Sequence, residues 1–259
     1  MSDVAAALYF FVTVELLGLA AWPLVRALLH RLPDRGWAFA KFGGVLLTTW
    51  LSWTLSRIRA LSYSRSHTVA LALVVAAACW GWASLDRRKN ARFLVTELKR
   101  AIVGPDRNWF IIGAEIIYIA AYFVWAGQRA RKPELLDLEK FMNIGFIASA
   151  LKTQYFPPLD QFLAREAINY YYFGHVIAAT IIQLSGTRAT VGYNLQMANV
   201  LGLGTAEAFS LGAGVFWAVS NAPKHCLAKR ALWAGVVSAT FSMLLGNLHW
   251  LIYAPLRGK

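Results

Sequence analysis

The sequence predicts an all-α membrane protein: a polytopic bundle of transmembrane helices, with interfacial helices and one long structured outer loop. Two observations predict this fold class. The 259 residues are 58% hydrophobic and only 15% charged, whereas soluble domains carry about a quarter of their residues as charged groups. The charges are clustered, and the apolar stretches between the clusters are roughly twenty residues long, which is the length of a helix that crosses a bilayer core.

About seven apolar stretches are long enough to be predicted as membrane spans. They are Val4–Leu29, Trp37–Leu55, Thr68–Ser84, Trp109–Gly127, Tyr170–Ser185, Val191–Ser220 and Ala231–Ala254. The sixth is long and rich in glycine, so it is either one kinked or tilted helix or two shorter pieces. No low-complexity linker divides the chain, which predicts a single transmembrane domain over residues 1–259.

The net charge of +13 would suit nucleic-acid binding. The Lys and Arg residues lie at the ends of apolar stretches, however, where basic residues anchor helices and set membrane topology. We therefore expect membrane lipids and no nucleic acid as partners, and a place in the cell (plasma or inner) membrane.

Residues 85–108 form a basic segment in which Phe93, Leu94, Leu98 and Ile102 recur at helical spacing. The pattern predicts an amphipathic helix on the cytoplasmic membrane surface. It serves either as a topology anchor or as a specific lipid-binding site.

The distribution of basic residues predicts an N-terminus outside the cell, a C-terminus in the cytoplasm and an outer loop over residues 128–169. The segments expected inside hold Arg26, Arg31, Arg35, Lys41, the seven basic residues of 87–107, Arg188, Arg257 and Lys259. The short loops expected outside hold Arg57, Arg59, Arg65, Lys224, Lys229 and Arg230.

Residues 128–169 mix acids and bases more densely than any other part of the chain. Within them, residues 141–152 are apolar enough to form a short helix on the membrane, and Pro157-Pro158 ends any helix before it. A long structured loop of this kind more often has a function than serves only to connect two helices.

The chain then enters the predicted fifth span through Tyr170, Tyr171 and Tyr172, followed by His175. Tyrosines at a helix start are typical of the aromatic belt at the headgroup level. Alternatively, the helical spacing of Tyr171 and Tyr172 to His175 lets one face present hydroxyls and an imidazole together.

Three carboxylates, Glu15, Glu115 and Glu207, lie inside predicted spans. A charge in hydrocarbon costs roughly 2.5–3.5 kcal/mol on insertion scales, so each is protonated, paired or facing a polar cavity. They belong to a site or, as readily, to interhelical hydrogen bonds that fix packing. Candidate partners are Arg26, Arg129, His175, Asn247 and His249. No metal or other cofactor is predicted, because Cys79 and Cys226 are far apart and no ligand cluster is visible.

The motif Tyr170-Tyr171-Tyr172-Phe173-Gly174 resembles that of the "YYY" family of polytopic membrane proteins of unknown function. The likeness continues along the chain. It includes Glu15–Gly18 with Pro23, Leu32–Gly36 with Trp37 and Lys41, Trp50, Trp53, Ser64-Arg65, Glu115, Arg129 with Pro133, Glu139-Lys140 with Met142, Pro157-Pro158 with Asp160, Asn169, Asn194 and Gly246–Leu248. The family in turn resembles C-type (GT-C) glycosyltransferases, which use lipid-linked sugars.

The resemblance implies an acidic residue in the outer loop that deprotonates the acceptor hydroxyl. By position that residue is Asn143, and an amide cannot act as the base. Asp160 is the candidate to replace it, with Glu139 as a further acid. The implied lipid-phosphate and sugar contacts are Lys140, Arg165, Asn169, Tyr170, Tyr171, Tyr172 and His175. A divalent metal is expected only if the chain is such an enzyme.

Relative to the family pattern the chain is short, and it stops just after Gly246-Asn247-Leu248. We therefore expect a shortened, non-catalytic member that acts as an accessory subunit of a larger membrane complex, with other membrane subunits as partners. The alternative is a glycosyltransferase that uses a polyprenyl-phosphate-linked sugar, with Asp160 as its base. Transport is a third hypothesis, and only the intramembrane carboxylates support it.

Overall fold

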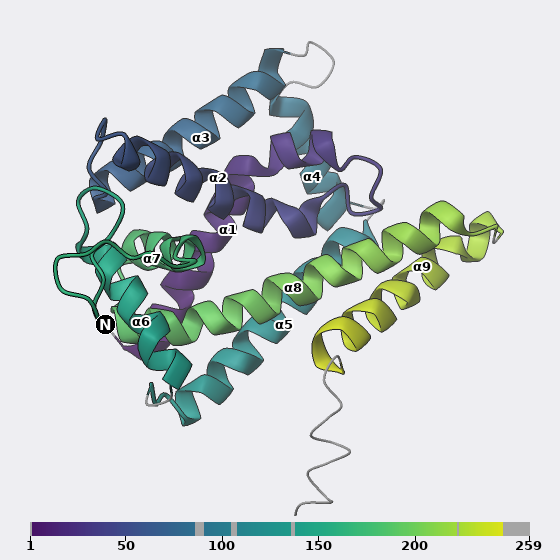
Figure 1. The fold of residues 1–259 in the computed structure, drawn as a ribbon. Coiled ribbons are helices and arrows are strands. Elements are labelled where there is room, and N and C mark those ends of the chain that lie inside the picture. The colour runs from purple at the N-terminus through teal and green to yellow at the C-terminus, as the bar shows by residue number, and fades with distance from the viewer. Residues whose placement is uncertain (1, 86–90, 105–107, 136–137, 222, 246–259) are drawn as a thin grey trace, which may run out of the picture.

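A computed structural model describes residues 2–85, 91–104, 108–135, 138–221 and 223–245. Throughout these ranges the regular structure is helical, apart from one isolated bridge between Leu159 and Ala167. The all-α prediction is confirmed. The helices are α1 Asp3–Leu28, α2 Trp37–Arg57, α3 Arg65–Leu85, α4 Ala91–Val103, α5 Trp109–Arg131, α6 Leu138–Lys152, α7 Phe173–Ser185, α8 Ala189–Val219 and α9 Lys224–Ala239, with a π-helical turn over Thr240–Leu244 (Figure 1).

Four helices, α1, α3, α5 and α8, are long and apolar enough to cross a membrane. The helix α2 is also long, with 21 residues, and it packs along α1, but it lies outside that set because it is more polar. The predicted seventh span continues beyond α9 into residues 246–254, which lie outside the described residues. Within the described residues, a helical membrane bundle is thus supported by four helices of spanning length and composition, against seven predicted spans.

The helix α7 does not run through the bundle, and the prediction of a span over 170–185 is wrong. At its start, Tyr172 Oη accepts a hydrogen bond from Trp53 Nε1 of α2 at 3.2 Å. Near its end, the Leu184 carbonyl accepts one from Arg65 of α3 at 3.3 Å. Both partners flank the short turn between α2 and α3, so both ends of α7 lie at one end of the bundle. With 13 residues, the helix is about 20 Å long, against about 30 Å for the hydrocarbon core.

The position of α7 also determines the location of Arg188, which follows this helix in the chain. Its guanidinium lies 3.9 Å from the carboxylate of Asp3 at the start of α1. Arg188 therefore shares an end of the bundle with the N-terminus and the α2–α3 turn, and its predicted place with Arg26 and Arg31 is wrong. The predicted grouping of Lys229 and Arg230 with Arg57 and Arg59 is also wrong. Both residues lie in the first half of α9, directly after Ala228, which lines a cavity together with Pro33 and Arg35 of the α1–α2 turn.

The helix α8 is continuous over 31 residues, which decides between the two predictions for the glycine-rich span in favour of one helix. The helix α5 runs alongside it, and α9 folds back antiparallel to it (Figure 1). Small residues allow this close approach: a Cβ added at Gly235 of α9 would lie 2.6 Å from the Phe209 carbonyl of α8.

The helices α1 and α2 also approach each other closely. A Cβ added at Gly44 would lie 1.9 Å from the carbonyl oxygen of Leu17, so only glycine fits there. The start of α2 is held by Asp34, which is 1% exposed. Its carboxylate accepts the N–H groups of Gly36 and Ala38 at 3.1 and 3.0 Å. Burial raises the pKa of the Asp34 carboxyl, and these hydrogen bonds partly offset the rise.

The predicted amphipathic segment contains α4, Ala91–Val103, so a helix forms there as expected. Leu94 is buried at 2% exposure, while Phe93 and Ile102 are 46% and 41% exposed. The short helix expected in the outer loop is α6. The position of α4 on the cytoplasmic surface stays a prediction.

Candidate functional site

The predicted outer-loop site is built mainly by α6 and by the segment that leads into α7. The Oδ1 atom of Asn143, in α6, lies 3.0 Å from the Nε2 atom of His175. Because an amide oxygen only accepts, the contact requires a proton on Nε2. The edge of the His175 ring also packs against Phe146, with ring centroids 5.2 Å apart. The structure thus brings together Asn143 and His175, which are separated by 32 residues in the sequence.

The three tyrosines have different environments. Tyr171 is 87% exposed and Tyr170 is 55% exposed. Tyr172 is half-buried, stacks on Phe156 with centroids 6.3 Å apart, and accepts the hydrogen bond from Trp53. The predicted common face of hydroxyls and imidazole does not form, because these residues precede the helix. Tyr172 is held by Trp53 and Phe156, and the Tyr170 ring packs against Phe146 of α6 with centroids 5.8 Å apart.

Asp160 lies in a small hairpin closed by its own N–H, which donates to the Glu166 carbonyl at 2.8 Å. Its Oδ1 accepts the N–H groups of Phe162 and Leu163 at 2.7 and 3.2 Å, so the carboxylate fixes a turn. In the described part of the chain, no hydrogen bond joins Asp160 to Asn143 or His175. The other predicted residues of this region are Glu139, Arg165 and Asn169, which are exposed, and Lys140, which is half-buried.

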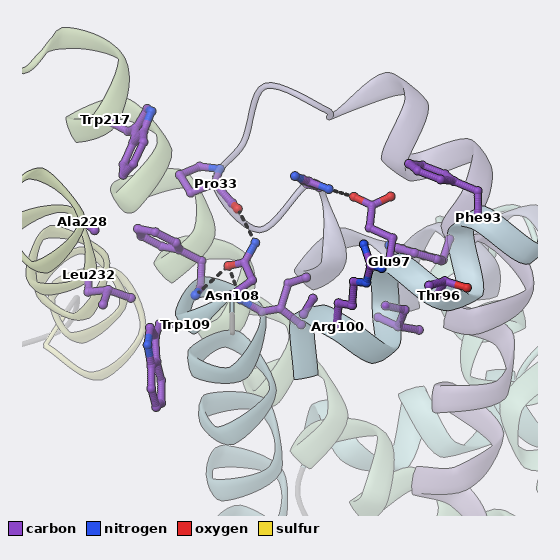
Figure 2. Close-up of a pocket in the computed structure, with 16 residues that line it drawn as sticks. Pro33, Phe93, Thr96, Glu97, Arg100, Asn108, Trp109, Trp217, Ala228 and Leu232 are labelled. Carbon is purple, nitrogen blue, oxygen red and sulfur yellow. Dashed lines mark hydrogen bonds and ion pairs between the residues drawn. The ribbon is translucent and has the colours of Figure 1, made fainter. Parts of the chain in front are cut away.

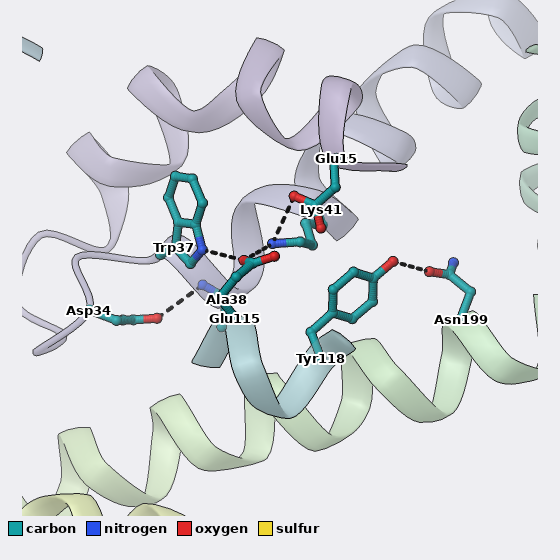
Figure 3. A network of polar contacts seen from close by, with 8 residues as sticks. All are labelled: Glu15, Asp34, Trp37, Ala38, Lys41, Glu115, Tyr118 and Asn199. Carbon is teal, nitrogen blue, oxygen red and sulfur yellow. Dashed lines mark hydrogen bonds and ion pairs between the residues drawn. The ribbon is translucent and has the colours of Figure 1, made fainter. Parts of the chain in front are cut away.

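A second polar cluster lies inside the bundle, where α1, α2 and α5 meet (Figure 3). The Lys41 ammonium lies 2.7 Å from the carboxylate of Glu115 and 3.3 Å from that of Glu15. The Lys41 residue is only 3% exposed. One buried cation is thus shared by two carboxylates from two other helices.

The surroundings of Lys41 hold its charge in place. The indole Nε1 of Trp37 donates to the same Glu115 oxygen at 2.8 Å. The Lys41 ammonium also lies 5.1 Å from the Trp37 ring centroid and 5.0 Å from that of Tyr118, which is cation–π distance. Tyr118 Oη in turn donates to Asn199 of α8 at 2.9 Å (Figure 3). The cluster therefore ties four helices together through side chains.

Sequence reasoning found Glu15 and Glu115 but missed their partner. Lys41 was expected among the charges of an inner loop, and that prediction is wrong. A signal was present, because Lys41 lies within the predicted span Trp37–Leu55. The partners predicted for the carboxylates pair elsewhere: Arg26 with Glu97 at 2.7 Å and Arg129 with Asn194 at 2.6 Å.

The third intramembrane carboxylate, Glu207, stays outside this cluster. Its Oε1 is buried and has no hydrogen-bond partner among the described residues. Asn247 and His249 lie outside the described residues. Within the described ranges, no group of three or more His, Cys, Asp or Glu side chains could hold a metal ion.

Residues 47–257 match the model of a family described as an uncharacterized membrane protein family, DUF2298. The chain belongs to this family. No curated protein and no solved structure matches the chain. Family membership and the four long apolar helices agree that this is a multi-pass membrane protein in contact with lipid.

Proposed function

We propose that this chain is a non-catalytic relative of the GT-C glycosyltransferases, within the "YYY" family, and that it acts as an accessory subunit of a larger membrane complex. One observation carries the proposal. The position at which the resemblance implies a catalytic acid holds Asn143, and its amide oxygen is 3.0 Å from His175 Nε2. An amide in that hydrogen bond positions α6 against α7 and takes no proton from an acceptor hydroxyl.

The intramembrane charges support the same function. Lys41 lies between Glu15 and Glu115 in a buried arrangement that connects helices. Such a cluster suits a rigid scaffold better than a proton path, which would need further titratable groups at successive depths.

The outer face of α9 is a candidate surface for the partner. Trp233 and Val237 are four residues apart, so they lie on one helix face, and they are 62% and 52% exposed. The opposite face of α9, with Gly235, packs on α8. Exposed tryptophan on a helix of a membrane protein suits contact with another protein or with lipid.

For the orientation, we propose that the end of the bundle with the α1–α2 turn and α4 faces the cytoplasm. The described basic residues at that end are Arg26, Arg31, Arg35, Arg92, Lys99, Arg100, Lys229 and Arg230, whereas the short turns at the other end carry Arg57, Arg59, Arg65 and Arg188. An excess of Lys and Arg in short loops marks the cytoplasmic side. The N-terminus and the α6–α7 region are then outside.

Extraction in a gentle detergent, followed by native mass spectrometry, tests the subunit role. We expect an integral membrane protein to be retained at fixed stoichiometry. Trp233→Ala should reduce its retention, whereas Trp82→Ala, which removes a tryptophan of similar exposure (53%) from α3, should not. Purification of the unmutated chain as a lone, well-behaved monomer would refute the role.

A glycosyltransferase that uses a polyprenyl-phosphate-linked sugar is the second candidate. The observation that favours it is that Asp160 Oδ1 alone accepts the two turn hydrogen bonds, which leaves its second oxygen for an acceptor hydroxyl. Lys140 or Arg165 would then contact the lipid phosphate, and the Tyr170–Tyr172 rings the sugar or lipid.

Asp160→Asn separates the two functions, because asparagine keeps the Oδ1 acceptor for the turn and loses only the ability to take a proton. If the chain is an enzyme, lipid-dependent glycosyl transfer falls by at least the 10²-fold typical of a lost general base, while the melting temperature is unchanged. If the subunit proposal is correct, the unmutated protein shows no transfer with any polyprenyl-phosphate sugar.

A further inference from the structure

A cavity of about 610 Å³ lies between α4, the turn before α2, the start of α5 and the α8–α9 pair (Figure 2). Its two walls differ in chemistry. One carries Arg35, Glu97 and Arg100, and the other is apolar and aromatic, with Trp109, Trp217 and Leu232. The volume falls within the roughly 300–1,000 Å³ that ligand pockets typically have.

The polar wall has an excess of positive charge. Glu97 of α4 pairs with Arg26 at 2.7 Å and also with Arg35, so one carboxylate serves two guanidinium groups. Arg100 follows one turn later on α4 and is exposed, and no carboxylate of the described residues lies within ion-pair distance of it. An anion would complete this arrangement.

The apolar wall is open to the surroundings of the bundle. Trp109 is 56% exposed and Trp217 is 40% exposed. Trp217 packs edge-on against Phe110, with ring centroids 5.7 Å apart. Tryptophans at the start of one span and the end of another occupy the depth at which headgroups meet acyl chains. Such a wall suits a hydrocarbon chain that descends from a headgroup at Arg100.

We propose that this cavity binds one anionic phospholipid, with its phosphate at Arg35 and Arg100 and an acyl chain along Trp109, Trp217 and Leu232. Charge complementarity selects the headgroup, and the aromatic wall distinguishes a lipid from a free phosphate. The proposal is independent of the subunit role, because a structural lipid could occupy the site in either functional reading.

Titration of the purified protein with phosphatidylglycerol, followed by native mass spectrometry and by melting temperature, tests the site. We expect one lipid per chain to be retained, at least tenfold more tightly than phosphatidylcholine with the same acyl chains. Arg100→Gln should weaken phosphatidylglycerol binding about fivefold, the effect of one basic residue near an anionic lipid. It should weaken phosphatidylcholine binding less, because the choline ammonium partly neutralises the phosphate of that lipid.

The matched control is Lys99→Gln, which removes the same charge from the neighbouring position of α4 without lining the cavity. It should leave lipid binding within twofold of the unmutated protein. Equal losses in the two variants would overturn the site in favour of diffuse attraction to the basic helix. Stabilisation by inorganic phosphate or by a short-chain phosphatidylglycerol as strong as that by the long-chain lipid would overturn the acyl-chain contact. Equal binding of the two long-chain lipids would overturn the proposal as a whole.

Discussion

Lys41→Met is expected to destabilise the bundle by about 3–5 kcal/mol, the loss typical when one partner of a buried ion pair is removed. Methionine has a similar length and fills the space of the lysine stem. The substitution leaves the carboxylates of Glu15 and Glu115 buried without their shared cation, which lies 3.3 and 2.7 Å from them. Denaturant unfolding in mixed micelles, followed by circular dichroism, measures the change.

The control combines Lys41→Met with Glu15→Gln and Glu115→Gln. Glutamine keeps an oxygen that accepts the Trp37 Nε1 hydrogen bond, and no unpaired charge remains. Replacement of a whole buried ion pair by neutral groups is often without cost, so the triple variant should recover most of the lost stability. A triple variant as unstable as Lys41→Met, or a single variant as stable as the parent, would show that the cluster does not hold the helices together.

Gly44→Ala should destabilise the protein by about 1–3 kcal/mol or more, as overpacking of a tight contact does. The added Cβ would lie 1.9 Å from the Leu17 carbonyl oxygen and 2.4 Å from its carbon. Both are backbone atoms, so α1 and α2 must separate. The melting temperature in detergent reports the effect.

Gly81→Ala is the matched control, because Gly81 is also inside a helix but a Cβ there would meet nothing within 4 Å. Alanine is favoured over glycine in a helix by about 1 kcal/mol, so this variant should be slightly more stable than the parent. Changes of the same sign in the two variants would contradict the close α1–α2 contact.

The sequence predicted the helical class and most helix positions because apolar length and charge clustering report directly on the bilayer. It misplaced residues 170–185 for the same reason. This stretch is as apolar as a short span, and nothing in its composition shows that both ends contact one turn. That information is carried by Arg65 and Trp53, which are distant in the sequence.

The individual residues of the candidate site could be predicted from the sequence, but the contacts between them could not. An isolated Glu15 or Glu115 in an apolar stretch demands a partner, and this identified the carboxylates. The position of Lys41 inside a predicted span was visible in the sequence, but its pairing with Glu15 depends on the approach of α1 and α2 at Gly44, which is a matter of tertiary packing. The contact between Asn143 and His175 was hidden for the same reason. Asn143 was selected from the resemblance alone and His175 from its spacing to Tyr171 and Tyr172, and no sequence spacing relates Asn143 to His175.

Labelling of single cysteines with a membrane-impermeant maleimide, in a background of Cys79→Ala and Cys226→Ser, tests the central arrangement most directly. Arg59→Cys, Arg188→Cys and Arg31→Cys report on the α2–α3 turn, the end of α7 and the α1–α2 turn. Because α7 lies across one end of the bundle, positions 59 and 188 should label together in intact cells, and position 31 only after permeabilisation. Labelling of position 188 together with position 31 would show that α7 crosses the membrane and would contradict the account.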